Sequence, residues 1–471
     1  MLSFNLDSNT RQKESGEGEN AKNRVPSELY QFFSGVGKTL LVKGNPGVGK
    51  TIFSLTLLKE IGERENGIYV STRVDVEGLY NQFPWLKEVI LEHNIIDAAQ
   101  DSIPARDILE LLYKKVVDID MDYPMVVIDS LLCLDALISA DEYKKLEHEI
   151  ASFARRSAAH IVLVVEYAEI KSLDYLVDGI VTLKNVRIHG EAHFGDVWRG
   201  GLETKDSREI VIDKLRGTPI KQKNYAYSLY QGRFQYFEPF LPKPLELAQT
   251  AIRDPTDFLI SSGNKEFDTI LNGGFNKGSF NLFEVEHGVD QRYVHLIASI
   301  ISNAVLEDKG LILFGIGGKD IANFQKKLLE AHSSKDVWII KKCDSDTDDN
   351  VIPFTGNLYE AIEKIHELRK QSKKEFVYIL GLDLFEYYMG QKDTIKLVEE
   401  FIEGILGSND VFVGIVKRPQ QIIDVISHIA DTHFVFKDIN GSLGMYGMRP
   451  KTVIYNIALK AGDELIFTPI V

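Results

Sequence analysis

A chain of 471 residues with 44% hydrophobic content is too long for one ordinary hydrophobic core, so two or three domains are expected. Its 54 Lys and Arg residues against 69 Asp and Glu residues give a net charge of −15. This balance argues against a general polyanion-coating role, because nonspecific DNA affinity depends on clustered basic side chains, and it leaves nucleic acid as a partner only through a local basic patch.

Cysteine usage and hydropathy favour a cytoplasmic protein. Cys133 and Cys343 both lie near apolar runs, so neither a disulfide framework nor a metal site is expected and a reducing compartment fits. No apolar stretch reaches the length that crosses a bilayer, and the first residues lack the apolar segment of a secretory signal. Contact with a membrane is therefore not expected.

The first domain is predicted to follow a mobile leader. Residues 8–23 are polar and nearly free of large apolar side chains, so residues 1–24 are predicted to form this leader. Over residues 25–238, short β-rich runs alternate with amphipathic segments, which is typical of a mainly parallel sheet flanked by helices. The strands are predicted at 40–43, 67–72, 125–129, 161–165, 179–187 and 209–216, with an aromatic strand pair within 225–236.

Residues 44–51 read GNPGVGKT directly after an apolar strand. In the pattern G-x-x-x-x-G-K-[ST] the backbone N–H groups wrap phosphates, the Lys reaches the β and γ phosphates, and the hydroxyl ligates Mg²⁺. The anion also meets the N-terminus of the helix predicted at 52–61. A Gly-rich turn that matches by chance is the alternative, but the strand before and the helix after favour binding of ATP and Mg²⁺. The predicted nucleotide-binding residues of this segment are Gly44, Asn45, Pro46, Gly47, Val48, Gly49, Lys50, Thr51 and Ile52.

Acidic residues are expected beside this loop. Asp129 ends the apolar run MVVID and is predicted to hold Mg²⁺ through water, with Thr51 as a direct ligand; a helix N-cap is the alternative reading. Hydrolysis also needs an acid that orients water, and the strand at 67–72 ends in Arg73 instead. Acids after that strand, Asp75 and Glu77, are equally suited to stabilising a helix start. The predicted catalytic residues are Lys50, Asp129, Asp75 and Glu166.

A second domain is predicted after a proline-containing connection. Pro239, Pro242 and Pro244 interrupt the pattern, so residues 239–255 are predicted to be a linker or a short helix. The strand and helix alternation resumes over residues 256–471, with strands predicted at 311–314, 376–382 and 411–416 and a helix at 359–371. The predicted fold is therefore α/β, with two tandem domains.

The second domain begins as a duplicate of the first. Laying Gly37 on Gly278 also lays Gly47 on Gly288. In this register the loop residues Gly44, Gly49, Lys50 and Thr51 become Val285, Asp290, Gln291 and Arg292. Bulk at the first position is expected to hinder the tight loop, and the carboxylate stands where phosphate charge would lie. A degenerate loop that binds no ATP is predicted.

The segments GNPGVGKT, VVIDS and KLRGT, with the duplicated opening LNGGFNKGS, resemble the KaiC branch of the RecA-like ATPases. The likeness is greatest to archaeal KaiC-like proteins related to the gas vesicle regulator D, and it covers nearly all of residues 25–471. It implies tandem RecA-like P-loop domains, ATP and Mg²⁺ as cofactors, and self-association in a ring, such as a hexamer, with nucleotide between subunits. In such a ring Lys214 and Arg216 would reach the neighbouring subunit's phosphate.

The chain also departs from the pattern of this family. A Glu pair normally follows the second strand, where this chain has Arg73 and Val74, and a His often stands where this chain has Ile220. In the second domain no K-x-R-G-T equivalent is expected, since the corresponding stretch reads RPKTVIYNIALKA. These departures leave turnover open while nucleotide binding stays predicted.

Three functions remain from the sequence. One is a slow ATPase whose nucleotide state controls assembly or binding of a regulatory protein partner. Another is an ATP-dependent switch that does not hydrolyse. The third, a DNA-acting recombinase or motor, is disfavoured by the acidic balance and by the lack of an obvious basic and aromatic stretch.

Overall fold

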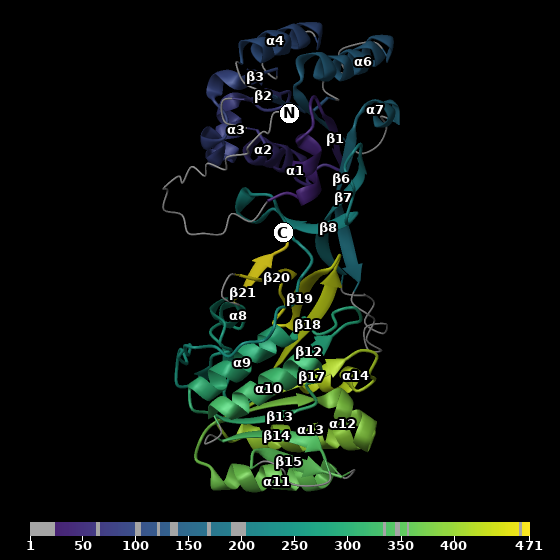
Figure 1. The fold of residues 1–471 in the computed structure, drawn as a ribbon. Helices are drawn as coiled ribbons and strands as arrows, with labels where there is room; N and C mark the ends of the chain where they lie inside the picture. The colour runs from purple at the N-terminus through teal and green to yellow at the C-terminus, as the bar shows by residue number, and fades with distance from the viewer. Residues whose placement is uncertain are drawn as a thin grey trace, which may run out of the picture.

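The protein consists of two lobes, each built on one large sheet with helices on both faces (Figure 1). The computed structural model describes residues 24–471 except for gaps at 63–65, 99–104, 120–122, 132–139, 167–170, 190–203, 333–335, 344–348, 356–357 and 461–463. Apart from Arg24, the leader expected at 1–24 lies outside the described residues. The predicted fold class, two tandem mainly parallel α/β domains, is confirmed.

The first sheet has nine strands in the order β3-β2-β4-β5-β1-β6-β7-β8-β9. Its neighbours are parallel from β3 to β6 and antiparallel from β6 onward. The strands are β1 (Thr39–Gly44), β2 (Gly67–Ser71), β3 (Ile95–Asp97), β4 (Met125–Asp129), β5 (His160–Glu166), β6 (Gly179–His189), β7 (Thr204–Leu215), β8 (Asn224–Ser228) and β9 (Gln235–Tyr236).

Side chains of each central strand alternate between two cores, because successive residues of a strand point to opposite faces. On β1, Leu40 and Val42 pack in the cluster that contains α1, α2 and α3, whereas Leu41 packs in the cluster that contains α4 and α6. Both faces are thus covered, which explains the continuous apolar runs of these strands. The helices are α1 (Ser27–Phe33), α2 (Lys50–Glu60), α3 (Val76–Gln82), α4 (Ala105–Asp118), α6 (Ala140–Ser157) and α7 (Lys171–Leu176), with short 3₁₀ turns η1 (Pro84–Glu88), η2 (Glu92–Asn94) and η3 (Tyr230–Gly232).

The second sheet repeats the strand order of the first. Its ten strands run β15-β14-β13-β16-β17-β12-β18-β19-β20-β21, so β12 takes the place of β1, β17 that of β5, and β16 that of β4. The strands are β12 (Ser279–Val285), β13 (Gly310–Phe314), β14 (Val337–Lys342), β15 (Val351–Phe354), β16 (Phe376–Gly381), β17 (Val411–Lys417), β18 (Thr432–Ile439), β19 (Ser442–Arg449), β20 (Tyr455–Leu459) and β21 (Leu465–Pro469). A separate two-stranded sheet joins β10 (Leu259–Ile260) to β11 (Phe275–Asn276).

Helices cover both faces of this sheet as well. The cluster on one face includes α8 (Lys265–Ile270), α9 (Val294–Leu306) and α10 (Lys319–His332). The cluster on the other face includes α11 (Leu358–Gln371), α12 (Leu382–Met389), α13 (Gln391–Leu406) and α14 (Ile423–Ile429). Among the described residues, no helix combines the length and the apolar character that a membrane span requires.

The two lobes meet through an apolar cluster and through backbone contacts. Ala226 and Phe237 of the first lobe pack with residues of β18 and β19 and with residues next to β20 and β21: Val435, Ile439, Tyr446, Ile454 and Ile470. The Ser228 hydroxyl donates to the Pro469 carbonyl at 2.5 Å, and the Leu229 amide donates to the Val471 carbonyl at 3.1 Å. Figure 1 accordingly draws β8 beside the end of the chain, between the lobes.

Residues 239–255 contain neither helix nor strand and lie against the second lobe. Phe240 and Leu245 are 8% and 5% exposed and belong to its core. The Phe240 amide donates to the Gly441 carbonyl at 2.9 Å, and the Asp254 carboxylate pairs with the buried Lys309 amine at 2.7 Å. This connection is therefore extended and docked, without the helix that the sequence left open.

Candidate nucleotide-binding site

The loop between β1 and α2 has the backbone shape that its glycines permit. Gly47 and Gly49 have φ of +82° and +87°, in the left-handed region that L side chains rarely adopt. A Cβ at Gly49 would lie 2.6 Å from the Leu229 side chain, whereas a Cβ at Gly47 would meet nothing within 4 Å. The loop is thus closed on the β8 side and open at Gly47, and α2 begins directly at Lys50 with its unpaired amides.

Lys50 folds back over its own loop. Its amine donates to the carbonyl oxygens of Gly44 at 2.7 Å and Asn45 at 3.0 Å. Burial lowers the pKa of the Lys50 amine, while the nearby carboxylates of Glu166 and Asp129 act in the opposite direction. The amine is therefore held at the open side of the loop by two neutral carbonyl oxygens. A phosphate group would be a stronger hydrogen-bond partner for it than these carbonyls.

Thr51 and Asp129 meet at the end of β4. The Thr51 hydroxyl donates to Asp129 Oδ2 at 2.5 Å, and the Tyr69 hydroxyl donates to the same oxygen at 2.9 Å. Burial, followed by the charge of Asp129, raises the pKa of Tyr69 well above its ordinary value, so Tyr69 keeps its proton and remains a donor. A hydroxyl and a carboxylate are hard oxygen ligands of the kind that Mg²⁺ prefers.

The candidate acids are engaged elsewhere. Asp75 is the N-cap of α3, where its carboxylate accepts from the Gly78 amide at 2.7 Å. Glu166 ends β5 and pairs with Arg73, with 2.5 Å between Oε1 and Nη2. The strand beside the loop strand is β5, because β4 and β5 lie between β2 and β1. Of these two acids, Glu166 ends the strand beside β1, and its Cα lies opposite that of Gly44.

Lys214 and Arg216 lie toward the amino-terminal ends of the parallel strands, whereas their own loop follows the carboxyl end of β1. Lys214 pairs with Ile180, which in turn pairs with Leu41, three residues before Gly44. The Lys214 amine donates to the carbonyls of Asp174 and Val177, both at 2.7 Å, just at the end of α7. The structure therefore does not bring these two cations to the Lys50 site of the same chain.

The remaining predicted residues lie at the exposed tip of the loop and at its buried base. Asn45 and Pro46 are exposed at the tip, whereas Val48 is 1% exposed. Ile52 packs against the core cluster that contains α2.

Three side chains that the sequence did not indicate support the loop from β7 and β8. The Arg208 guanidinium donates to the Gly47 carbonyl at 3.2 Å, the Tyr227 hydroxyl donates to the Val48 carbonyl at 2.7 Å, and Leu229 covers Gly49. Tyr69 on β2 is a fourth residue that the sequence did not indicate, and it contacts Asp129. Arg208, Tyr227 and Leu229 are far from the loop in the chain, so only the strand order could have indicated them.

The loop of the second lobe keeps the backbone shape without the phosphate ligands. Gly288 has φ of +83°, and Asp290 has φ of +54° where the first loop has Gly49. Val285, which replaces Gly44, is 3% exposed at the end of β12. In contrast to α2, helix α9 begins only at Val294, three positions later in the shared register.

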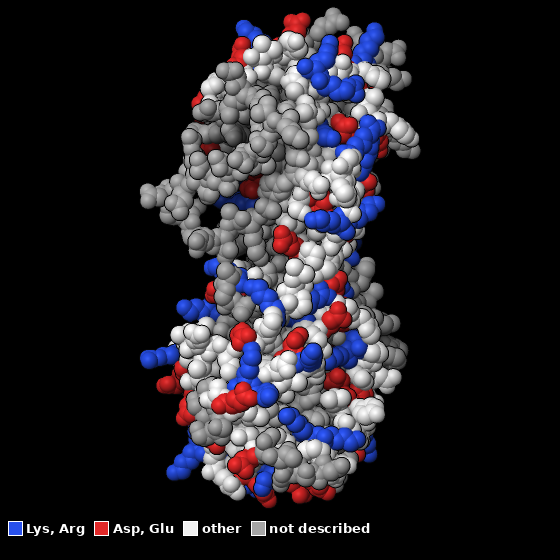
Figure 2. Space-filling view, viewed as in Figure 1, with Lys and Arg blue, Asp and Glu red and all other residues white. Residues whose placement is uncertain are grey.

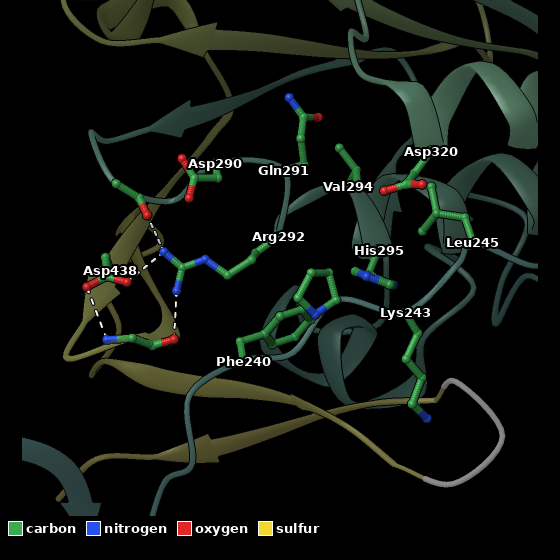
Figure 3. A pocket seen from close by; sticks show the side chains of 13 residues that line it. Phe240, Lys243, Leu245, Asp290, Gln291, Arg292, Val294, His295, Asp320 and Asp438 are labelled. Carbon is green, nitrogen blue, oxygen red and sulfur yellow. Dashed lines mark hydrogen bonds and ion pairs between the residues drawn. The ribbon is translucent and has the colours of Figure 1, made fainter. Parts of the chain in front are cut away.

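Arg292, which replaces Thr51, closes the second loop from within (Figure 3). Its guanidinium donates to the Gly288, Val289 and Gly441 carbonyls and pairs with Asp438 at 2.6 Å. A cavity of about 520 Å³ remains beside it, with Phe240 and His295 on its wall and the carboxylates of Asp290 and Asp320 at its sides. The charge of Arg292 is already neutralised, so this loop offers no comparable anion site.

The second sheet nevertheless keeps cations at the K-x-R-G-T position. Arg449 pairs with His433, which pairs with Leu282, just as Lys214 pairs with Ile180 and Leu41. Arg449 donates to the Ala430 carbonyl at the end of α14, and Lys451 follows two residues later, as Arg216 follows Lys214. The expectation that this segment has no equivalent is therefore wrong; R-P-K-T takes its place.

The geometry of the first loop fits a Mg²⁺-bound nucleotide. Its mouth is open at Gly47, one lysine amine faces it, and a hydroxyl and a carboxylate lie together 2.5 Å apart at its base. The second loop has none of these three groups at the corresponding positions, where Gln291, Arg292 and Gly381 stand.

The chain is similar to known proteins. Residues 29–194 match the family described as the GvpD gas vesicle protein, P-loop domain. The chain is 26% identical to Protein GvpD2 of Halobacterium salinarum over 92% of its own length and 93% of that protein. It is 30% identical to Protein GvpD1 of the same organism over 54% of this chain and 49% of that protein. It is 25% identical to the circadian clock oscillator protein KaiC of Parathermosynechococcus lividus over 59% of this chain and 51% of that protein.

The tandem sheets, the strand-loop-helix unit at Gly44–Thr51 and these likenesses agree with one another. Membership of a P-loop family implies nucleotide binding, with Mg²⁺ as its usual companion. The chain is a KaiC-like, RecA-type P-loop protein related to GvpD.

Proposed function

We propose that this protein binds Mg·ATP at Gly44–Thr51, hydrolyses it slowly, and uses its nucleotide state to control assembly or binding of a regulatory protein partner in the cytoplasm. The proposal is based on the hydrogen bonds that the Lys50 amine donates to the Gly44 and Asn45 carbonyls, at 2.7 and 3.0 Å. An amine held by neutral carbonyls gains by exchanging them for phosphate oxygens, since charge-assisted hydrogen bonds are the stronger ones.

Each group of this site has a role in that proposal. The loop amides and the start of α2 bind the phosphates, and Lys50 reaches the β and γ phosphates. Thr51 and Asp129 would hold Mg²⁺, the former through its hydroxyl and the latter through water, and Tyr69 orients the Asp129 carboxylate by its 2.9 Å hydrogen bond. When bound, Mg²⁺ neutralises charge on the phosphates.

Slow turnover is supported by the contacts of the two candidate catalytic acids, Glu166 and Asp75. Glu166, which ends the strand beside β1, is paired with Arg73 at 2.5 Å, and Asp75 caps α3. As long as Glu166 stays paired with Arg73, a water near the γ phosphate would lack a ready base, and base catalysis typically contributes about 10²–10⁴-fold in rate. A switch that binds ATP without hydrolysing it is the alternative that the same pairing supports.

Self-association is part of the proposal. Lys214 and Arg216 lie at the opposite sheet edge from their own loop, and the Arg216 side chain is 54% exposed. This arrangement supports contact with the nucleotide of a neighbouring copy, as in a ring such as a hexamer. Figure 2 shows Lys and Arg mingled with Asp and Glu over the viewed face of the described residues, which lends no support to a DNA-acting motor.

Calorimetric titration of the purified chain with Mg·ATP tests binding, and phosphate release tests turnover. Lys50→Ala is expected to weaken binding at least about tenfold, since a charge-assisted contact is lost. Lys59→Ala is the matched control, because Lys59 is an exposed lysine on the same helix. Equal affinity in the wild type and Lys50→Ala would contradict the proposal, and binding without Lys50-dependent phosphate release would favour the non-hydrolysing switch.

A further inference from the structure

Arg73 lies where an acid is expected and forms an ion pair across the end of β4. Its Nη2 is 2.5 Å from Glu166 Oε1, and the two side chains are 49% and 31% exposed. Arg73 follows β2 and Glu166 ends β5, so the pair spans β4, the strand between them that ends in Asp129. The guanidinium is therefore held at the carboxyl edge of the sheet, where ligands of parallel sheets bind.

Both members of the pair act electrostatically on Lys50. The Glu166 carboxylate raises the pKa of the Lys50 amine and the Arg73 guanidinium lowers it, although burial has the largest effect. In a P-loop this amine reaches the β and γ phosphates. Arg73 is thus within electrostatic range of the position that a terminal phosphate would take.

In the second lobe, whose loop has lost its lysine, both members of the pair are missing too. Counted along the paired strands, Gly317 stands in the place of Arg73 and Lys417 in the place of Glu166. Gln291 replaces Lys50 in the same register. The Arg–Glu pair is therefore present in the lobe whose loop has phosphate ligands and missing from the lobe whose loop does not. Since both lobes have the same fold, the fold alone does not require the pair.

A half-exposed ion pair is weak, and a terminal phosphate attracts arginine more strongly than one carboxylate because it carries more charge. Exposed pairs contribute little because solvent screens them and two side chains must be ordered. The planar guanidinium matches two oxygens of a phosphate as well as the two oxygens of a carboxylate, but a γ phosphate carries more charge than the Glu166 carboxylate. Exchange of one partner for the other is therefore favourable when the nucleotide has a γ phosphate.

We propose that Arg73 distinguishes ATP from ADP: it leaves Glu166 for the terminal phosphate of ATP and keeps Glu166 when that phosphate is missing. The proposal rests on the proposed function, since it needs nucleotide at the Lys50 loop. Arg73 is then a specificity-determining residue, and the Arg73–Glu166 contact reports the nucleotide state to the β2–α3 segment.

The test is a set of dissociation constants for Mg·ATP and Mg·ADP, measured on the full chain by calorimetry. The wild type is expected to prefer ATP by about tenfold or more, the size of one charge-assisted contact. Arg73→Gln is expected to bring this ratio close to one while ADP affinity stays unchanged, and Arg73→Lys is expected to keep part of it. Glu166→Gln removes the competing carboxylate and is expected to tighten ATP more than ADP.

An ATP to ADP ratio that is the same in the wild type and Arg73→Gln, or an equal loss for both nucleotides, would overturn the role of Arg73. Circular dichroism and a thermal melt of each variant establish that it is folded, which the half-exposed position of Arg73 favours. Failure of the proposed function has a different signature: the wild type would then bind neither nucleotide in a Lys50-dependent manner.

Discussion

Gly49 and Asp290 occupy the same position in the two loops and share the left-handed backbone, with φ of +87° and +54°. The duplicated lobe therefore preserved the path of the chain after it lost the glycine that makes this path inexpensive. Asp tolerates the conformation better than most residues, but its Cβ still crowds the backbone. The second loop is consequently a strained structure without the phosphate ligands that the first loop retains.

Asp290→Gly is expected to stabilise the second lobe by about 0.5–1 kcal/mol, because the left-handed strain is removed and part of the gain is offset by backbone entropy. Urea unfolding followed by tryptophan fluorescence measures the change. Asp290→Ala is the control, since it removes the carboxylate but keeps the Cβ, and no stabilisation is expected from it. A gain of equal size in both variants would show that the carboxylate, and not the backbone, is responsible.

The strand-loop-helix order and the position of Asp129 could be predicted, because both depend on local patterns. The apolar runs of β1 and β4, the glycines between β1 and α2 and the repeat after residue 256 are all visible in one dimension. These patterns gave the fold class and the two lobes. Bounds of the central strands agree within a few residues because the sheet is covered on both faces.

Contacts between distant strands could not be predicted. Arg208 and Tyr227 hold the loop carbonyls from β7 and β8, and Glu166 meets Arg73 across β4. Such pairs depend on the strand order, which crossover connections rearrange relative to the sequence. Arg449 was missed for a related reason: its equivalence to Lys214 exists in the sheet register, while the surrounding letters have diverged.

Leu229 joins the first loop to the second lobe. Its side chain covers Gly49, and its amide donates to the Val471 carbonyl at 3.1 Å. Nucleotide that orders the loop is therefore expected to slow amide exchange at Leu229 as well as at residues 44–51. Hydrogen exchange with mass spectrometry, with and without Mg·ATP, measures this protection. Lys50→Ala serves as the control and should show no change, and protection confined to the loop would show that the lobes are uncoupled.

Lys214→Ala and Arg449→Ala form a matched pair of variants. Each cation donates to the carbonyl that follows a helix, at Val177 and Ala430, so each variant is expected to lose about 1 kcal/mol of stability. Only Lys214 belongs to a lobe with a lysine-bearing loop, so only Lys214→Ala is expected to reduce ATP-dependent assembly. Native mass measurement with and without Mg·ATP tests this difference. Equal assembly in both variants would show that Lys214 has no role in assembly beyond its hydrogen bond at the end of the helix.

His160, the first residue of β5, is expected to make stability depend on pH. It is 4% exposed, its Nδ1 accepts from the Lys38 amide at 3.2 Å, and burial, helped by the charge of Lys38, lowers its pKa from 6.5 to about 4. The unfolded chain then binds more protons than the folded chain between these two values. This contribution to stability is therefore complete above pH 6.5 and is lost progressively as the pH falls toward 4.

His160→Gln is expected to have a flatter dependence of the unfolding free energy on pH than the wild type between pH 6.5 and 4. The difference between the two curves is the informative quantity, because carboxylates that titrate in the same range contribute to both. His428→Gln is the matched control, since His428 is exposed, and it should retain the wild-type slope. Urea unfolding at a series of pH values measures all three proteins. Parallel curves for the wild type and His160→Gln would show that the imidazole is protonated equally in the folded and unfolded chains.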